Sequence, residues 1–451
     1  MRKLLKKRVV PLVGIIASSA LVLAGCSAPS SSTSGGATGG KQSVTFWHRT
    51  FTPVENEWYA QVVKDFNAAQ DKIVVKDQQI PADSWDQKLK AAQAAGNAPD
   101  VYTHSGTLND AVRLGQVAEL KGLVSDEALA KINDGGKRVA QIGGKWYAYP
   151  LLLEPQTVLF WNKDMFKAAG LDPEVAPKSW DELYRFCETL KPTLKDGQFC
   201  ISTAEDADTF AWSTVGQQVG VSGHKPVSED WSKANATDPK YVQLLNFYKT
   251  LYDKGYIPKQ PLNLYVEASS FGQGKTAMMV SGSWAMSEIG SDYADMVPKT
   301  GVAPFVTSTG NPDEVTSTAG NFKWVVDAKS KNKEAAAKFV EWVLGGDAKV
   351  LVPFFVKTQF TKAPVRDDVL EEVNKQPEAG KASWSKVVTT QIVPKTVAEP
   401  AYPWDISRAF GLAMEKAMMG QATPEAALQE AQGTIQGIID RENLKDQAST
   451  K

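Results

Sequence analysis

Glu154 and Gln156 are the polar side chains whose placement first indicates a site. They stand on either side of Pro155, between two apolar, strand-like runs at residues 147–153 and 157–161. A carboxylate beside buried strands needs a partner, because burying it unpaired is costly. Pro155 has no N–H for a sheet, which disfavours one continuous central strand. Either the chain crosses here between two lobes, with Glu154 and Gln156 in the cleft, or it makes a polar turn within one domain.

Polar and aromatic side chains also follow other strand-like runs. They are, in chain order, His48 and Arg49, His104 and Ser105, and Ser283 and Trp284. Open α/β sheets bind ligands at the carboxyl ends of their strands. We therefore expect these side chains to line one cleft.

The thirteen tryptophans indicate a class of ligand. Trp58, Trp180 and Trp342 fall on apolar helix faces and are explained by core packing. Five others adjoin polar or turn-like residues: Trp47, Trp85, Trp212, Trp284 and Trp404. Tyr402 has similar surroundings. Aromatic faces can pack against the C–H face of a sugar ring, each adding about 0.5–1.5 kcal/mol by analogy with aromatic pairs. As a set they favour a carbohydrate, although a place in the core explains each one equally well.

Motifs for catalysis, phosphate binding or metal binding are weak. The sequence has no Gly-x-Ser-x-Gly and no His-x-x-x-His, and Gly274-Lys275-Thr276 lacks the earlier glycine of a phosphate-binding loop, since position 269 is Ser. His48 and His104 could meet at the strand ends, but two histidines without a further ligand are weak evidence for a metal site. Histidines that form hydrogen bonds are the favoured interpretation. We predict no metal, no cofactor and no enzyme.

Size and charge limit the fold class and the partners. The 451 residues exceed what one core usually organises, so two α/β lobes are expected. The formal charge is −1, and it becomes −6 once the N-terminal segment is removed, because that segment carries five cations and no acid. A mildly acidic body argues against nucleic acid as the partner.

The N-terminus predicts export. A basic head precedes an apolar run in residues 1–25, as in a secretory signal peptide. Its end, Leu23-Ala24-Gly25-Cys26, resembles the bacterial lipoprotein signal, which implies lipid on Cys26 and a membrane-anchored protein. Residues 26–41 are rich in Ser, Gly, Thr and Ala and would form a flexible tether. No later run is long and apolar enough to span a bilayer.

Two further cysteines, Cys187 and Cys200, remain after Cys26. An even pair in an exported protein is compatible with a disulfide, and two buried thiols are the alternative.

The elements expected between these residues alternate strand and helix, which predicts a parallel sheet covered by helices. Residues Trp58, Val62 and Phe66 recur at helical spacing. Two helices carry capping-box patterns at their starts, formed by Ser84 with Gln87 and by Ser179 with Glu182.

Several segments together resemble the extracellular solute-binding proteins of family 1, the maltose-binding-like receptors of ABC importers. They are GNAPDV at 96–101, GKWYAYP at 144–150, FWNKDMF at 160–166, GKTAMM at 274–279, GSWA at 282–285, GVAP at 301–304 and SKNKEAA at 330–336. The likeness runs in order through most of residues 44–439.

The resemblance implies a two-lobed periplasmic-binding-protein-like fold with a hinge, lobe 1 being 42–152 plus 308–358 and lobe 2 being 156–305 plus 363–451. It implies closure on an oligosaccharide or similar solute and docking on a membrane permease. Trp284 stands where proteins of this family carry the aromatic residue that stacks on the sugar. The other positions carried over are His48, Arg49, His104, Ser105, Glu154, and Asn321 and Phe322 where the family often has a glycine-rich turn.

The sequence thus predicts a monomeric, lipid-anchored sugar-binding protein on the outer face of a cell membrane. A secreted glycosidase is the alternative, although the two carboxylates that it needs are not evident. The same fold binding a metal or a peptide is a third reading. Which sugar is bound does not follow from the sequence.

Overall fold

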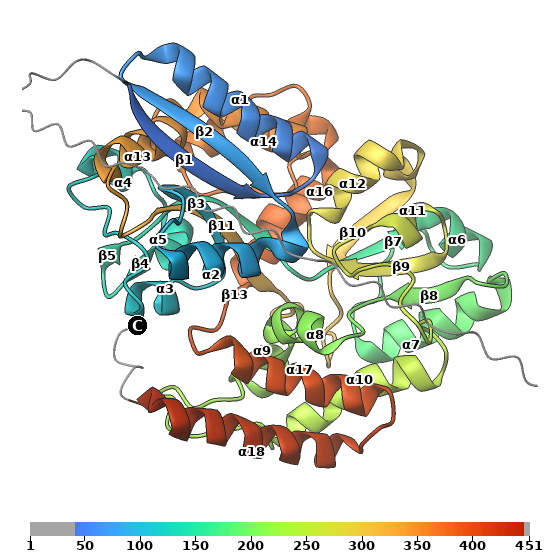
Figure 1. The fold of residues 1–451 in the computed structure, drawn as a ribbon. Helices are drawn as coiled ribbons and strands as arrows, with labels where there is room; N and C mark the ends of the chain where they lie inside the picture. The colour runs from blue at the N-terminus through green and yellow to red at the C-terminus, as the bar shows by residue number, and fades with distance from the viewer. Residues whose placement is uncertain (1–40, 446–451) are drawn as a thin grey trace, which may run out of the picture. The chain divides into compact units, whose positions relative to one another are not determined.

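The computed structural model describes residues 41–445. The predicted signal peptide, Cys26 and nearly all of the predicted tether lie outside this range. In the described part, the strands form a seven-stranded sheet, a four-stranded sheet and a small two-stranded sheet of β4 (Gln141–Ile142) and β5 (Lys145–Trp146) (Figure 1). No helix of residues 41–445 is long and apolar enough to cross a membrane.

The seven-stranded sheet has the order β12-β6-β11-β3-β1-β2, with β13 pairing to the start of β11. Its strands are β1 (Gln42–Arg49), β2 (Ile73–Ile80), β3 (Val101–Ser105), β6 (Tyr149–Pro155), β11 (Thr318–Val326), β12 (Ala363–Pro364) and β13 (Val397–Ala398). β1 is parallel to β2 and β3, whereas β11 is antiparallel to both β3 and β6. The sheet is therefore mixed rather than parallel as expected, because β11 starts at the edge where β3 and β6 end.

The helices that accompany this sheet are α1 (Pro53–Ala69), α2 (Trp85–Ala95), α3 (Asn109–Arg113), α4 (Asp126–Ala130), α5 (Asp134–Ala140), α13 (Lys333–Val340), α14 (Val352–Lys357) and α15 (Asp367–Asn374). The predicted apolar stripe of α1 is buried: Trp58, Val62 and Phe66 pack with Phe46 of β1 and Phe339 of α13 in one core. Burying one face of each helix on the sheet is what orders this layer.

The four-stranded sheet has the order β10-β7-β9-β8. Its strands are β7 (Val158–Asn162), β8 (Phe199–Ser202), β9 (Thr276–Ser281) and β10 (Thr300–Pro304). The helices of this part are α6 (Lys163–Ala168), α7 (Trp180–Leu190), α8 (Ala207–Ser213), α9 (Val215–Ser222), α10 (Pro239–Asp253), α11 (Ser269–Gly272), α12 (Ala285–Asp292), α16 (Ser383–Val387), α17 (Trp404–Met418) and α18 (Pro424–Glu442).

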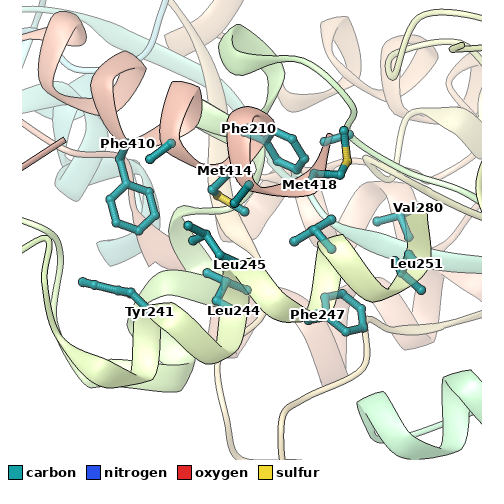
Figure 2. Packing of buried hydrophobic residues seen from close by; sticks show 14 of the residues in the cluster. Phe210, Tyr241, Leu244, Leu245, Phe247, Leu251, Val280, Phe410, Met414 and Met418 are labelled. Atoms are coloured by element: carbon teal, nitrogen blue, oxygen red, sulfur yellow. The ribbon is translucent and has the colours of Figure 1, made fainter. Parts of the chain in front are cut away.

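A second core lies among α8, α10 and α17. Figure 2 shows Phe210, Leu245 and Met414 from these three helices pointing toward one another. Gly411 permits the close approach of α17 to α8, because a Cβ there would lie 2.1 Å from the carbonyl oxygen of Ala207. Two sheets with separate cores are the basis of the two lobes.

The two capping predictions have different outcomes. Ser179 Oγ accepts a hydrogen bond from Glu182 N at 3.1 Å, so this residue caps α7 as expected. The prediction for Ser84 is wrong, because its side chain caps nothing and Ser84 Oγ donates to the carbonyl of Pro81 instead. A short 3₁₀ turn before α2 turns Ser84 away from the free N–H groups of that helix.

The chain crosses between the sheets at the predicted place. β6 ends at Pro155 in the first sheet and β7 begins at Val158 in the second. A second crossing, residues 305–317, leads from β10 to β11. After α16, the β13 segment (residues 396–403) pairs with β11 before the chain enters α17.

Strand limits and packing move the expected lobe limits. The resemblance places residues 363–382 in lobe 2, but β12 pairs with β6, and Val369, Val373 and Ala382 lie in the core of the first sheet. The apolar face of α15 packs in the first core, and none of these three residues belongs to the second core. We therefore propose lobe limits of 42–155 plus 318–382 and 158–304 plus 383–445, with the β13 segment lying against the first sheet.

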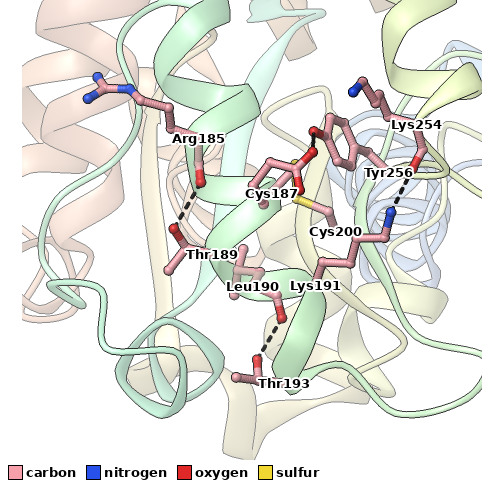
Figure 3. The surroundings of a disulfide bond; sticks show 10 residues. Arg185, Cys187, Thr189, Leu190, Lys191, Thr193, Cys200, Lys254 and Tyr256 are labelled. Atoms are coloured by element: carbon pink, nitrogen blue, oxygen red, sulfur yellow. Dashed lines mark hydrogen bonds between the residues drawn. A yellow bond between two sulfur atoms is a disulfide. The ribbon is translucent and has the colours of Figure 1, made fainter.

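Cys187 of α7 and Cys200 of β8 form a disulfide, and both are buried. Figure 3 shows Tyr256 beside this bond, where its hydroxyl donates to Glu188. The disulfide joins α7 to β8, the edge strand of the second sheet.

Replacing both cysteines, C187S with C200S, should lower the free energy of unfolding by about 3 kcal/mol, because the bond closes a short loop in the unfolded chain. The two residues are 13 apart in the sequence. Urea unfolding of the oxidised protein and the double variant measures the difference. An unchanged midpoint at an unchanged slope would contradict the expectation.

Candidate functional site

The first two crossings lie side by side and satisfy one another's backbone groups. Gln156 N donates to the carbonyl of Thr318 at 3.0 Å, and Thr157 N donates to Ser317 Oγ at 3.0 Å. On the other side, Ser283 N donates to the carbonyl of Pro155 at 3.0 Å. These bonds bring the end of β6, the start of β11 and the turn after β9 to one place.

An aromatic cluster adjoins the first crossing. Trp212 of α8 lies 6.1 Å from Trp284 and 5.3 Å from Tyr265 between ring centroids. Trp284 Nε1 donates to the carbonyl of Val266 at 3.0 Å, and the missing side chain of Gly282 leaves room for its indole ring. Trp212 and Trp284 are partly exposed. The structure thus brings together two of the tryptophans selected from the sequence.

Tyr265 ties this cluster to the crossing and was not selected from the sequence. Its hydroxyl donates to the carbonyl of Gln156 at 2.9 Å, and its own carbonyl accepts from Ser281 Oγ at 2.8 Å. A search for every aromatic residue in a turn-like segment, rather than for tryptophans first, would have included it.

A polar cluster lies on the other side of Gln156. Glu399 of the β13 segment accepts from Gln156 Nε2 at 2.8 Å and from Asn321 Nδ2 at 2.9 Å. Lys323, which is buried, donates to Asn321 Oδ1 and to the carbonyl of Gly106. The sequence indicated Gln156 and Asn321 but gave no signal for Glu399, a single acid in an irregular segment.

Burial and neighbouring charge set the protonation of this polar cluster. Burial raises the pKa of Glu399, with Lys323 opposing the shift. Burial lowers the pKa of Lys323 to about 8, with Glu399 opposing. The pKa of His104 falls to about 3, through burial and then through the charge of Lys323. His104 is therefore neutral near pH 7, and its buried Nδ1 has no hydrogen-bond partner among the described residues.

Glu154 does not present a free carboxylate. Its Oε2 accepts from Lys362 Nζ at 2.6 Å, and the same ammonium lies 3.4 Å from Glu55 Oε1. Burial alone would lower the pKa of Lys362, but the two carboxylates outweigh it and raise the pKa. The partner that the sequence required for Glu154 is thus a lysine of the protein. This pairing differs from our expectation that the carboxylate faces a bound molecule.

The remaining candidates fall into two groups. His48, Trp85 and Tyr402 are buried: His48 stacks on Tyr59 at 4.5 Å, Trp85 belongs to a small core, and Tyr402 belongs to the second core. They have little surface to offer a ligand. The others have some exposure: Arg49 and Ser105 end β1 and β3, Phe322 lies within β11, and Trp404, which is 47% exposed, begins α17.

Glu205 is a buried acid that the sequence reasoning missed. It follows β8 and precedes the capping residue of α8, and its carboxylate has no hydrogen bond or ion pair to another residue within 41–445. Burial, followed by the charge of Asp206, raises its pKa to about 8. Near neutral pH it is therefore a protonated group, able both to donate and to accept a hydrogen bond.

The arrangement suits binding of a neutral molecule with one apolar face and several polar groups. Indole and phenol rings stand on one side of Gln156, and amide, carboxylate and ammonium groups stand on the other. Among residues 41–445, no group of three or more His, Cys, Asp or Glu side chains is placed to hold a metal ion.

Comparison with known proteins gives consistent matches. A family model described as bacterial extracellular solute-binding protein matches residues 52–350. The chain is 25% identical over 366 residues to the maltooligosaccharide ABC transporter solute-binding lipoprotein of Streptococcus pneumoniae, covering 78% of this chain and 79% of that protein. It is 25% identical over 351 residues to the arabinooligosaccharide-binding protein of Bacillus subtilis, covering 76% and 77%.

The fold is also matched by solved structures. An ABC transporter solute-binding protein from Thermotoga lettingae TMO superposes with a TM-score of 0.76 at 24% identity, covering 88% of this chain and 100% of that chain. The predicted two-lobed fold is confirmed.

Lys362→Met should lower the free energy of unfolding by about 3–5 kcal/mol, because it leaves Glu55 and Glu154 buried without their cation. As a control, Lys249→Met removes an i,i+4 pair with Asp253, whose side chain is 54% exposed, and should cost about 0.5 kcal/mol. Urea unfolding of both variants provides the comparison. Equal small losses would show that the buried pair contributes no more than the exposed one.

Glu205→Gln should flatten part of the dependence of stability on pH. With a folded pKa of about 8 against an ordinary 4.5, the native state keeps a proton that the unfolded state has lost. The free energy of unfolding therefore falls as pH rises from about 5 to 8. Unfolding at pH 5, 6.5 and 8 should show a smaller fall for Glu205→Gln than for the wild type or for Glu425→Gln, an exposed control. Identical slopes in all three proteins would refute this assignment.

Proposed function

The chain belongs to the bacterial extracellular solute-binding protein family, and from this membership we propose that it captures a carbohydrate between its two lobes and delivers it to the permease of an ABC importer. The names of its relatives in Streptococcus pneumoniae and Bacillus subtilis support an oligosaccharide as the ligand.

One observation carries the proposal: Gln156 joins an aromatic cluster to a polar cluster. Its carbonyl accepts from Tyr265, beside Trp212 and Trp284, while its side chain donates to Glu399. Partly exposed indole rings supply apolar contact for the C–H faces of sugar rings. The amide and carboxyl groups beyond Gln156, together with the guanidinium of Arg49 at the end of β1, would supply partners for hydroxyls.

Binding would proceed by hinge closure. Arg49 and Ser105, at the ends of β1 and β3, belong to the first sheet and reach the surface, whereas Trp212 and Trp284 belong to the second lobe. A ligand that contacts both sets gains more free energy in the closed form than in the open form, so it shifts the lobe equilibrium. The crossings at 156–157 and 305–317 supply the hinge.

Lipid on Cys26 would hold the protein at the outer face of the cell membrane, with residues 27–41 as the tether. In this arrangement the protein acts as a monomer, requires no cofactor and changes no covalent bond in the sugar. The permease is its partner in the membrane.

Two other functions compete with this proposal. The first is that of a glycosidase, and the second is that of a receptor of this fold for a metal or a peptide. Incubation with oligosaccharides and analysis for shortened products tests the first. A metal-content assay on the purified protein tests the second. Catalytic products, or stoichiometric metal, would replace the present proposal.

A thermal-shift screen against mono- and oligosaccharides should identify the ligand, because a ligand at a hundred times its dissociation constant stabilises by about 2.7 kcal/mol. Calorimetry with that sugar should then show that Trp284→Ala and Trp212→Ala weaken binding about tenfold or more, equivalent to 1.4 kcal/mol. Each variant removes one stacking face.

Trp180→Ala is the matched control for these variants. Trp180 belongs to the same lobe and is partly exposed, but it stacks on Phe247 at 4.8 Å and makes no ring contact with Trp212 or Trp284 in the described part of the chain. It should keep the wild-type affinity, and the thermal midpoint of each variant shows whether it remains folded. Unchanged affinity in both cluster variants would place the sugar elsewhere.

A further inference from the structure

Glu399 connects three segments that are distant in the sequence. It lies in the β13 segment, accepts from Gln156 at the first crossing and accepts from Asn321 on β11, where the second crossing arrives. Each carboxylate oxygen takes one of the two bonds, Oε1 from Gln156 and Oε2 from Asn321. The side chain therefore holds these segments at one fixed spacing.

The hydrogen bonds continue beyond Glu399 in both directions. From Gln156 they run through its carbonyl to Tyr265, next to Trp212 and Trp284 of the second lobe. From Asn321 they run through Lys323 to the carbonyl of Gly106, just after β3. One continuous path thus connects the aromatic cluster of the second lobe to the strand ends of the first, and Glu399 is its central member.

We infer that Glu399 is a positioning residue: its ionised carboxylate sets the position of the aromatic cluster relative to the first sheet, and it thereby controls ligand affinity without touching the ligand. The part of this inference that concerns affinity rests on the proposed function. The part that concerns the position of one lobe relative to the other does not rest on it.

The ionised form is needed because both oxygens of a carboxylate are acceptors, one for Gln156 and one for Asn321. Protonation turns one of these oxygens into a hydroxyl, whose hydrogen competes with the amide donor. The charged and titratable groups facing it are Lys323 from β11, Glu154 from β6 and, behind Lys323, His104 at the end of β3. Because burial raises the pKa of Glu399, protonation begins at a higher pH than for an ordinary glutamate, and the connection weakens as pH falls. Lys323, with a pKa of about 8, is mostly protonated at pH 7.5, and His104, with a pKa of about 3, stays neutral down to pH 5.

The position of one lobe relative to the other can be measured without a ligand. Spin labels at K88C on α2 and Q243C on α10, both exposed positions, report the distance between the lobes in a full chain that also carries C26S. We expect Glu399→Ala to broaden or shift this distance distribution at pH 7.5. Glu399→Gln, which keeps one acceptor oxygen, should give a smaller change.

Glu314 provides the matched control. It is also a partly exposed carboxylate with two donors, but both of them, Ser308 and Thr309, lie within the second crossing itself. Glu314→Ala should leave the distance distribution as in the wild type. A change equal to that of Glu399→Ala would overturn the inference, because any loss of a hinge hydrogen bond would then have the same effect.

Two further measurements separate positioning from mere stabilisation. Lowering the pH from 7.5 to 5 should move the wild-type distribution toward that of Glu399→Gln, and should leave Glu399→Gln itself unchanged. With the sugar found by thermal shift, Glu399→Ala should bind at least about threefold more weakly, with Glu399→Gln between it and the wild type. A pH response that persists in Glu399→Gln, or an unchanged lobe distance in Glu399→Ala, would refute the role of Glu399. If no sugar binds, the proposed function fails, while the distance measurements still decide this inference.

Discussion

The pairing of polar groups at the crossings is the constraint on which the rest of this structure depends. Where the chain leaves one sheet and enters another, its N–H and C=O groups lose the regular partners of a strand and still have to be satisfied. Gln156 N donates to Thr318 at the start of β11, and Thr157 N donates to Ser317 at the end of the second crossing. The two crossings therefore stabilise each other, and the side chains that they carry become the meeting point of both lobes.

Three acids of the described residues differ in chemistry because their surroundings differ. Glu154 is neutralised by Lys362, so it contributes to the architecture of the first lobe. Glu399 accepts two amide N–H groups and connects segments from different parts of the chain. Glu205 has neither arrangement within the described residues, and its burial favours the protonated form. Burial is costly for a charge in each case, and the available donors decide how that cost is met.

Much of the fold follows from local patterns. The apolar stripe of α1, the cap at Ser179 and the break at Pro155 all appear where the residues predict them. The failures have tertiary causes. Ser84 is turned away by a 3₁₀ turn, and β11 reverses the sheet direction because it enters from a crossing. The helix α15 packs in the first core, although the expected division places it in lobe 2. Of the residues that the structure brings together at the crossings, Trp212, Trp284, Gln156 and Asn321 are indicated by the sequence, whereas Tyr265 and Glu399 are not.

The sequence by itself determined the alternation of elements, the position of the first crossing and the kind of side chains available for a ligand, because periodicity, proline and residue type act over a few neighbours. Only the tertiary structure decided which partner each polar group has. Lys362 lies 208 residues from Glu154, and Glu399 lies 243 residues from Gln156. Contacts between residues so far apart are fixed by the packing of two sheets and their crossings, and no local pattern encodes them.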